Sequence, residues 1–391
     1  MKPIAWIALV VTSTLAGAES HSAAGKAAYE KGDYRLAASE FDFALIEAQE
    51  FPPLDPRRAI SLCNAALAAK AQAQYSRAET LLTQAIRLLD SIEPMQLSTI
   101  DAHEKLANLK RLQGRDSAAE GLYQAVIADL KSVEATNSRQ YAVAMNNLGD
   151  LYASQGRYTA AEEHYRKSLE VTRIAFGDDE IQIGVRLQNL GQVAARTHRL
   201  AEAERLYRES IAITRRTRGL HHPQLATGLN NLAQLMVLRK EYGEAQRLFQ
   251  EALEIWQASV GPAHPDYASG LGNLATLYHV RRQFTKAEEL YRRALAVNQT
   301  ALGPQHPSVA RDLNNLGTVA FETHRYAEAE TLYNQALRIR EATLDRNHPA
   351  LQETLNNLAA VYFRMGRPAE GEMAATKAMT IHVRNTLRDA R

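Results

Sequence analysis

The sequence lacks the features by which enzymes and metal proteins are most often recognised. It has a single cysteine, so no disulfide can form within the chain, and Cys63 lies in an apolar segment where a small packing residue is expected. It contains no G-x-S-x-G, H-E-x-x-H or C-x-x-C motif and no phosphate-binding loop. We therefore expect no catalytic residue, no metal and no cofactor, and a function other than that of an enzyme.

The sequence also lacks net charge of either sign. Its 46 Lys and Arg side chains nearly balance 44 Asp and Glu side chains, which gives a net charge of +2 over 391 residues. This balance removes the electrostatic argument for a nucleic-acid partner. The local cluster of Arg215, Arg216 and Arg218 is typical of a solvated helix end.

The N-terminus has the composition of a secretory signal peptide. Lys2 precedes an apolar run of 12 residues, from Ile4 to Leu15, and small residues follow up to Ala18. The run is shorter than the ~20 residues that a membrane-spanning helix needs, and Ala18 stands where a bacterial lipoprotein would carry its acylated cysteine. We expect residues 1–18 to be a signal peptide cleaved after Ala18, and the mature protein to be periplasmic or secreted, without stable membrane insertion. An uncleaved anchor or a short buried helix is the alternative.

What the sequence does contain is an internal repeat of 42 residues. The segment LNNLG begins at Leu313, and related segments begin at Met145, Leu187, Leu229, Leu271 and Leu355. Each unit has two apolar stripes of helical period separated by a turn, which predicts a helical hairpin whose apolar faces are buried by the next hairpin. Aligned on that turn, the chain has nine units, and one column contains Tyr34, Tyr75, Asp116, Tyr158, Leu200, Tyr242, Phe284, Tyr326 and Pro368.

The connections between units support this interpretation. A glycine follows each long second helix, where a left-handed residue is expected, at Gly177, Gly219, Gly261 and Gly303. A His-Pro pair then predicts the first turn of the next helix, at His222-Pro223, His264-Pro265, His306-Pro307 and His348-Pro349. Small residues that allow close helix packing recur at Ala161, Ala203, Ala245, Ala287 and Ala329.

The units resemble tetratricopeptide repeats, in the long form found in kinesin light chains and nephrocystin-like proteins. The matching segments are LNNLAAVY from Leu355, AETLYNQAL from Ala329 and LGPQHPSVA from Leu302. The resemblance implies an all-α, right-handed superhelical solenoid of about nine repeats. Because units before residue 138 depart from the pattern, we expect about three divergent repeats over residues 19–137 and six regular repeats, with a charged C-terminal end, over residues 138–391.

Two columns of polar residues interrupt the apolar core of the first helices. The main column comprises Asn147, Asn189, Asn231, Asn273, Asn315 and Asn357, and the residue before each supplies the second column, Asn146, Gln188, Asn230, Asn314 and Asn356. In a tetratricopeptide superhelix the first helices line the concave surface, so these amides should form a ladder with rungs ~8–10 Å apart. Amide groups can pair with the backbone of an extended peptide. The alternative is that each asparagine bonds to its own or the adjacent helix and holds the repeats in register.

Specificity for a peptide is expected from side chains near the ladder. Arg196, His279, Glu322, Arg364, Phe321 and Phe363 follow the ladder, while Arg311 and Glu353 precede it. The mixed signs of charge argue against a purely acidic or purely basic ligand. Phe321 and Phe363 are equally compatible with the core.

Two further patterns do not indicate a cofactor site. The recurring histidines occupy equivalent positions of repeats ~8–10 Å apart, too far apart to share one zinc ion, and they are expected to be connector residues. The segment Gly270 to Ala275 matches a loose G-x-G-x-x-A pattern, but it lies inside a repeat helix without a preceding strand.

The sequence therefore predicts a non-catalytic scaffold or adaptor that binds an extended segment of a partner protein in its groove. We expect it to act in the bacterial envelope. The alternatives are a structural protein that assembles through its open repeat ends, an assembly or secretion accessory factor that uses another surface, and an enzyme with an unrecognised site in the groove.

Overall fold

The computed structural model describes residues 19–92, 97–175 and 180–389. Within these ranges the chain forms helices and short connections without any strand, which confirms the expected all-α fold. None of the helices in these ranges is both long enough and apolar enough to cross a membrane. The predicted signal peptide with its cleavage position, and Gly177, lie outside the described residues.

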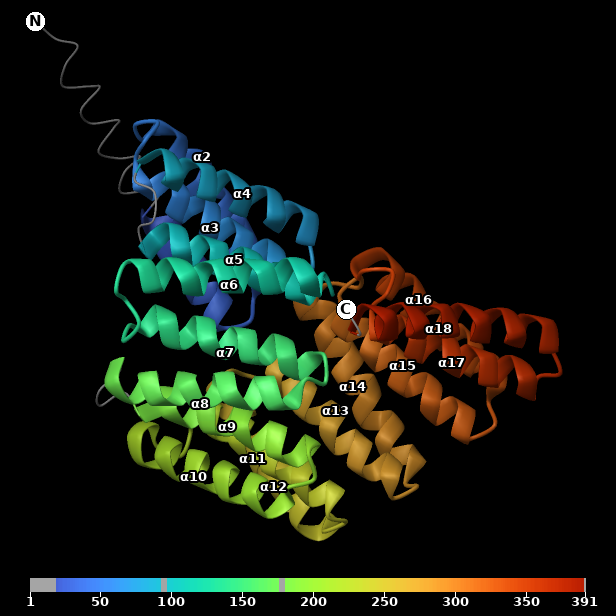
Figure 1. Cartoon of the computed structure of the whole chain (residues 1–391). Coiled ribbons are helices and arrows are strands. Elements are labelled where there is room, and N and C mark those ends of the chain that lie inside the picture. Colours follow the sequence, from blue (N-terminus) through green and yellow to red (C-terminus); the bar gives the residue numbers. More distant parts are fainter. Residues whose placement is uncertain (1–18, 93–96, 176–179, 390–391) are drawn as a thin grey trace, which may run out of the picture. The chain divides into compact units, whose positions relative to one another are not determined.

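The described helices follow one another as nine pairs (Figure 1). The first five pairs are residues 19–30 with α2 (Tyr34–Glu47), α3 (Pro56–Ala71) with α4 (Tyr75–Ile92), α5 (Leu97–Leu112) with α6 (Asp116–Ser132), α7 (Arg139–Ser154) with α8 (Tyr158–Ala175), and α9 (Glu180–Arg196) with α10 (Leu200–Arg218). The last four pairs are α11 (Pro223–Leu238) with α12 (Tyr242–Ser259), α13 (Pro265–Val280) with α14 (Phe284–Leu302), α15 (Pro307–Glu322) with α16 (Tyr326–Thr343), and α17 (Pro349–Arg364) with α18 (Pro368–Asp389). A short 3-10 helix, η1 (Ala48–Glu50), follows α2. All nine residues of the aligned column are the first residue of a second helix, so the predicted phase of the repeat is confirmed.

Packing divides the chain into two compact units. Of the described residues, the first unit comprises 19–92, 97–111, 116–175 and 180–219, and the second comprises 112–115 and 220–389. The expected boundary near residue 138 separates divergent repeats from regular ones. It concerns the sequence pattern and not packing, and it stays a prediction.

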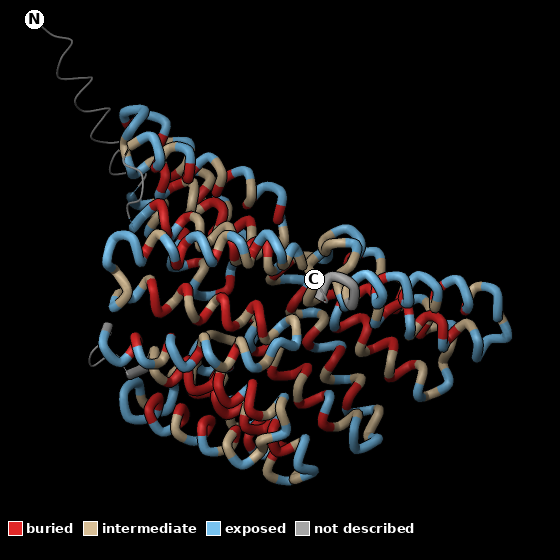
Figure 2. Tube along the Cα trace, viewed as in Figure 1, coloured by how far each residue is buried: buried red, intermediate tan, exposed pale blue. Residues whose placement is uncertain are grey.

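Within each pair the two helices pack through small residues, as expected. All five alanines of the predicted column are completely buried. On the opposing helix, Gly191 makes room for the ring of Tyr207, because a Cβ atom on Gly191 would lie 2.8 Å from that ring. Figure 2 shows the resulting pattern, with buried residues along the helix sides that face each other and exposed residues at many of the turns.

The connections have the backbone conformations that their residues favour. Gly219 and Gly303 end α10 and α14 at φ 82° and 92° with ψ −171° and 156°. This is the extended positive-φ region that only glycine adopts without strain, and not the left-handed helical region that the sequence predicts. Proline occupies the first turn of α11, α13, α15 and α17, as predicted.

The connector histidines are the N-caps of these four helices. In each case the histidine Nδ1 accepts a hydrogen bond of 3.1 Å from the backbone N–H two residues later, at His222, His264, His306 and His348. An accepting Nδ1 must be unprotonated. Burial lowers the pKa of His306 to about 4, and it also lowers the pKa values of His264 and His348. No group of residues that could hold a metal ion occurs in the described part of the chain.

Three interfaces between successive repeats of the second unit are filled by different contacts. Between α12 and α13, Gly270 leaves space for Trp256, whose ring would lie 2.6 Å from a Cβ atom on Gly270. Between α14 and α15, the Asn298 amide donates a hydrogen bond of 2.6 Å to the fully buried Asp312 carboxylate. Between α16 and α17, buried Arg340 donates to the carbonyl oxygen of Ala350 at 2.6 Å. These three interfaces therefore differ in shape and polarity.

Candidate functional site

One face of each regular first helix is left open to solvent. Its residues recur at i, i+4, i+7 and i+11, the spacing of a single helix side. On α11 they are Thr227, Asn231, Gln234 and Leu238, and all four are exposed or half-buried, whereas the adjacent Leu232 is buried. We call the equivalent residues of α7 and α9 in the first unit, and of α11, α13, α15 and α17 in the second unit, the open face.

All six asparagines of the main column lie on the open face and are half-buried. Several of them donate their amide Nδ2 to the second column of the preceding repeat. Asn189 donates to Asn146 Oδ1 at 2.8 Å, Asn273 to Asn230 Oδ1 at 2.9 Å, and Asn357 to Asn314 Oδ1 at 3.3 Å. These three bonds tie α9 to α7, α13 to α11 and α17 to α15, which is the register-holding role that the sequence left open.

The second column lies deeper than a polar strip on the surface would. Asn146, Gln188, Asn230 and Asn314 are all buried, whereas Asn356 in the last repeat is exposed. The buried amides accept from the neighbouring repeat or bond within the array; Gln188, for example, donates to Ser210 Oγ at 3.0 Å. They are therefore placed to support the ladder from behind, and Asn356 is the member of this column that solvent reaches.

Asn315 differs from the other rungs of the second unit. The second-column position of the preceding repeat is Gly272, which has no side chain to accept a hydrogen bond. Among the described residues, Asn315 accordingly has no hydrogen-bond partner for its side chain, and it is half-buried on the open face. Both its donors and its acceptor remain available to a ligand.

The first rung bonds to a carboxyl group where later rungs bond to amides. Asn147 donates a hydrogen bond of 2.7 Å to Glu104, which occupies the second-column position of the preceding repeat. Burial raises the pKa of Glu104 to about 7. Lys105, in the main column of that repeat, forms an ion pair with Asp101 on its own helix.

The structure separates the expected specificity residues into surface and core. Arg196, Glu322 and Arg364 occupy the same end of the open face in three different repeats. Arg311 and Glu353 occupy its other end. There Arg311 Nη2 lies 3.5 Å from Asp312 Oδ1, and Glu353 Oε2 lies 3.2 Å from Arg340 Nη1.

The aromatic residues of this set lie beside the open face. Phe321 packs against the core between α15 and α18 and contacts the Tyr326 ring at a centroid distance of 5.6 Å, whereas Phe363 is 51% exposed. His279 is half-buried against Phe284 at a centroid distance of 5.7 Å, and burial lowers its pKa. Of the three, Phe363 is the one with substantial surface for a ligand.

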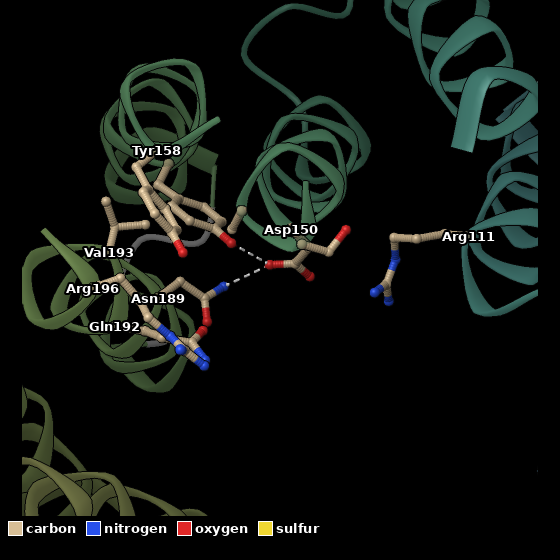
Figure 3. Close-up of a pocket in the computed structure, with 10 residues that line it drawn as sticks. Arg111, Asp150, Tyr158, Asn189, Gln192, Val193 and Arg196 are labelled. Atoms are coloured by element: carbon tan, nitrogen blue, oxygen red, sulfur yellow. Dashed lines mark hydrogen bonds between the residues drawn. The ribbon is translucent and has the colours of Figure 1, made fainter. Parts of the chain in front are cut away.

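A cavity of about 530 Å³ opens on this face in the first unit (Figure 3). It lies among α5, α7, α8 and α9, and Asn189 and Arg196 belong to its wall. Figure 3 shows Arg111 and Arg196 directed toward the same space from opposite sides, with the Asp150 carboxylate between them. The other lining residues are Ala153, Ser154, Tyr158, Tyr165, Gln192 and Val193.

Asp150 is held by neutral donors in this cavity. The Tyr165 hydroxyl donates to it at 2.7 Å, and the amides of Asn189 and Asn146 donate at 3.4 and 3.5 Å. Burial raises the pKa of Asp150, while the Tyr165 hydrogen bond and the charge of Arg111 act in the opposite direction. The cavity thus combines a shielded anion with two cationic side chains and a rung of the ladder.

Sequence reasoning missed the Arg111–Asp150 part of this site. Neither residue type recurs in its column: one repeat later, Ala153 takes the position of Arg111 and Gln192 takes that of Asp150. The position of Asp150 could still have been predicted from the sequence. It follows Asn146 by four residues, about one helical turn, so both side chains are expected on the same side of the helix, next to the ladder. The second-column residues were recognised, but their burial was not.

An array of helix pairs with an open polar face defines a class of protein-interaction scaffolds. The sequence matches the tetratricopeptide repeat family over residues 98–174, 185–258, 236–297 and 266–342, and a second tetratricopeptide repeat pattern over residues 351–385. These matches span more than half of the chain, and the chain belongs to the tetratricopeptide repeat family. No curated protein sequence matches the chain.

Solved structures with similar folds include repeat proteins of the kinesin light chain type. BtubC (BKLC) from P. vanneervenii is 25% identical, with 59% of this chain and 90% of that chain covered and a TM-score of 0.48. The nearly identical TPR-like repeats of a kinesin light chain from Podosopora anserina are 22% identical, with 53% of this chain and 98% of that chain covered. Two crystal structures of these repeats, one of them of a substituted form, give TM-scores of 0.45 and 0.44.

Proposed function

We propose that the open face binds an extended segment of a partner protein and that the chain acts as a non-catalytic scaffold. The observation that carries this proposal is the half-exposed column of asparagines on successive first helices. Two features favour a peptide backbone as the ligand. The amides offer donors and acceptors at every repeat, and an extended chain presents its backbone groups every ~6.6 Å per residue pair.

The hydrogen bonds between rungs support this proposal as well as the register of the repeats. An asparagine whose Nδ2 is held by the preceding repeat cannot rotate freely, so less side-chain entropy is lost when it binds. Its Oδ1 is then directed at a fixed point for a backbone N–H of the ligand. The same bonds thus stabilise the array and pre-organise the binding surface.

Asn315 and Asn273 provide a matched pair of variants that separates binding from stability. Asn315→Ala removes a rung without an inter-repeat bond, so we expect an unchanged unfolding midpoint and about a tenfold loss of peptide affinity. Asn273→Ala also leaves the buried Asn230 oxygen without its donor, so it should cost about 1–3 kcal/mol of stability. The measurements are urea unfolding and the affinity of linear peptides selected on the full chain from a random library.

The comparison has a clear negative result. If no peptide is selected, or if selected peptides bind the Asn315→Ala variant as tightly as the parent, the ladder is a structural device and the binding surface lies elsewhere. A substitution on a second helix, Arg247→Ala on α12, is the control, because Arg247 is 65% exposed by side chain and lies outside the open face.

We further propose that the scaffold works in the bacterial envelope, after removal of residues 1–18. The support is the charge, length and small-residue ending of the N-terminal segment. Expression with the native N-terminus in a Gram-negative host should give a periplasmic protein whose intact mass matches a chain that begins at Glu19. Recovery in the cytoplasm with residues 1–18 still present would contradict this setting and leave the peptide-binding proposal untouched.

A further inference from the structure

We propose that the solvent-facing side of α2 pairs with α2 of a second copy of this chain, antiparallel to it, so that the protein forms a dimer. α2 is the second helix of the first repeat and lies in the first unit. This pairing is independent of peptide binding, because the open face lies on other helices. It is carried by an apolar stripe on α2, by the charges around the stripe and by the symmetry of both.

The stripe consists of three large apolar side chains that solvent reaches. Leu36, Phe43 and Ile46 are 48%, 51% and 61% exposed, and their spacing of i, i+7 and i+10 places them on one side of the helix. The His21 ring lies beside Phe43 at a centroid distance of 5.4 Å and leaves it exposed. Phe41, by contrast, is completely buried in the core. α2 thus has one apolar side that packs inward and a second that remains open to solvent.

The stripe is peculiar to the first repeat. In the other eight second helices the three equivalent positions hold only charged residues, polar residues or alanine. The column of Phe43, for example, contains Gln84, Ala125, Lys167, Glu209, Glu251, Arg293, Gln335 and Lys377. The stripe is therefore not part of how the repeats pack on one another, and exposed apolar side chains grouped in this way are typical of an interaction surface.

The charges at the two ends of the stripe favour an antiparallel second copy as its partner. Arg35 precedes the stripe and Glu50 follows it; both are exposed, and among the described residues neither forms an ion pair. In an antiparallel pair the basic end of each stripe lies beside the acidic end of the other, which gives two contacts between Arg35 and Glu50. A parallel pair would place like charges together instead.

The uncharged residues of the stripe match in the same arrangement. A two-fold axis beside Phe41 places Leu36 of each copy opposite Ile46 of the other, because both lie five residues from the axis. It also places Ser39 opposite Phe43, so that a small side chain leaves room for a ring. Contacts of this kind involve the same surface on both copies, and they close on themselves as a dimer.

The acidic residues nearest the axis already have partners within each copy. Asp42 forms an ion pair with Arg77 of α4, and Glu40 Oε2 lies 2.6 Å from His21 Nδ1. Two copies therefore bring no unpartnered carboxylates together at the centre of the contact. An anionic membrane surface is a poorer occupant, because Glu50 and these carboxylates would face its negatively charged lipids.

Sedimentation equilibrium of the full chain, over about 1–200 µM, measures the pairing. We expect a monomer–dimer equilibrium with a dissociation constant on the order of 10–100 µM, since three apolar side chains on each copy form an interface below the standard size. Phe43→Ser should weaken the dimer by at least about tenfold. Met379→Ser is the matched control, because Met379 is 60% exposed on the last repeat, in the column in which Leu337 packs against the next repeat.

Exchange of the two charges tests the antiparallel geometry. Arg35→Glu and Glu50→Arg each place like charges together twice in the dimer, so each should weaken it by about threefold to tenfold. The double variant restores opposite charges and should return the dissociation constant to within about twofold of the parent value. A purely structural role of either residue within α2 would not produce this rescue.

Each outcome decides a different point. A dimer that is weakened by Phe43→Ser, unchanged by Met379→Ser and restored by the charge exchange supports the pairing. Loss in Met379→Ser alone, or growth into larger oligomers, identifies assembly through the open repeat ends and overturns it. A dimer without the charge rescue has another geometry and overturns it as well.

A monomer at every concentration also overturns the pairing and leaves the stripe to another occupant, such as residues 1–18 of an uncleaved chain or a different protein. Circular dichroism of each variant, with an unchanged unfolding midpoint, excludes misfolding as the cause of a loss. None of these outcomes bears on peptide binding by the open face, so the proposed function stands or falls separately.

Discussion

Replacing Asn298 with leucine is expected to lower the free energy of unfolding by about 3 kcal/mol near pH 8. Asn298 donates a hydrogen bond of 2.6 Å to the Oδ2 atom of Asp312, which is completely buried between α14 and α15. Among the residues that the structure describes, the other oxygen of Asp312 has only the longer contact of 3.5 Å to Arg311. The substitution would therefore leave a buried carboxylate oxygen without its donor.

The size of this loss should depend on pH. Burial already raises the pKa of Asp312 above its usual value near 3.8, so the ionised carboxylate reduces stability as the pH rises above that value. Removal of the Asn298 donor raises this pKa further, and the loss should be smaller near pH 5 than near pH 8. Urea unfolding of parent and variant at both pH values, monitored by the fluorescence of Trp256 in the same unit, gives the loss in free energy of unfolding at each pH.

A double variant tests the physical reason for the effect. Asn298→Leu combined with Asp312→Leu removes both polar partners, and replacement of a whole buried polar pair by apolar groups is often nearly neutral. We expect the double variant to be more stable than Asn298→Leu alone. If the single variant loses the same free energy at both pH values and the double variant loses more, Asn298 contributes by packing and not by its bond to Asp312.

The helix phase could be predicted from sequence because one period governs every unit. A column such as Tyr158, Leu200 and Tyr242 marks the start of a helix in each repeat, and an error in one unit is corrected by the others. The same regularity placed the asparagine column on one side of the first helices. Local rules for glycine and proline then located the connections, although Gly219 and Gly303 adopt a different positive-φ conformation from the one expected.

The contacts between repeats could not be predicted in the same way. Asn273 bonds to Asn230, 43 residues earlier, and that choice depends on how far one first helix is rotated against the next. The pair of Asn298 and Asp312 occupies columns that hold Trp256 and Gly270 one repeat earlier, so no common pattern marks these positions. Aligning the two columns side by side would have revealed that their sizes and polarities change together.

The cavity in the first unit was hidden for a similar reason. Its wall combines Asn189 from the ladder with Arg111 and Asp150 from two other columns. A repeat pattern describes what the units share, whereas Arg111 and Asp150 stand in columns that hold Ala153 and Gln192 one repeat later. Binding specificity in a repeat protein is expected to reside in such departures.

Acidification from about pH 6.5 to pH 4.5 is expected to reduce the stability that the histidine N-caps of α13, α15 and α17 contribute. Burial lowers the pKa of His306 to about 4 and lowers those of His264 and His348, while Arg311 acts in the same direction on His306 and Arg340 on His348. Asp266 and Asp345 oppose the shift at His264 and His348. Because these folded-state pKa values lie below the unfolded value of 6.5, the stability that the neutral histidines contribute is complete above pH 6.5 and is lost as the pH falls toward 4. An N-cap contributes about 1 kcal/mol, so the three caps together should account for about 3 kcal/mol.

Asparagine in place of the three histidines isolates this contribution from the other groups that titrate in the same range. Asparagine caps a helix at least as well as most residues but does not titrate. The triple variant His264→Asn, His306→Asn and His348→Asn should match the parent near pH 7.5 and exceed it by about 3 kcal/mol near pH 4.5, measured by urea unfolding with Trp256 fluorescence. Glu104 and Asp150 have raised pKa values and change stability in the opposite direction on acidification, but they are present in both proteins and cancel in the comparison. If the parent and the triple variant lose stability in parallel, protonation of the caps does not control the acid response, and the histidines are retained for their shape ahead of proline.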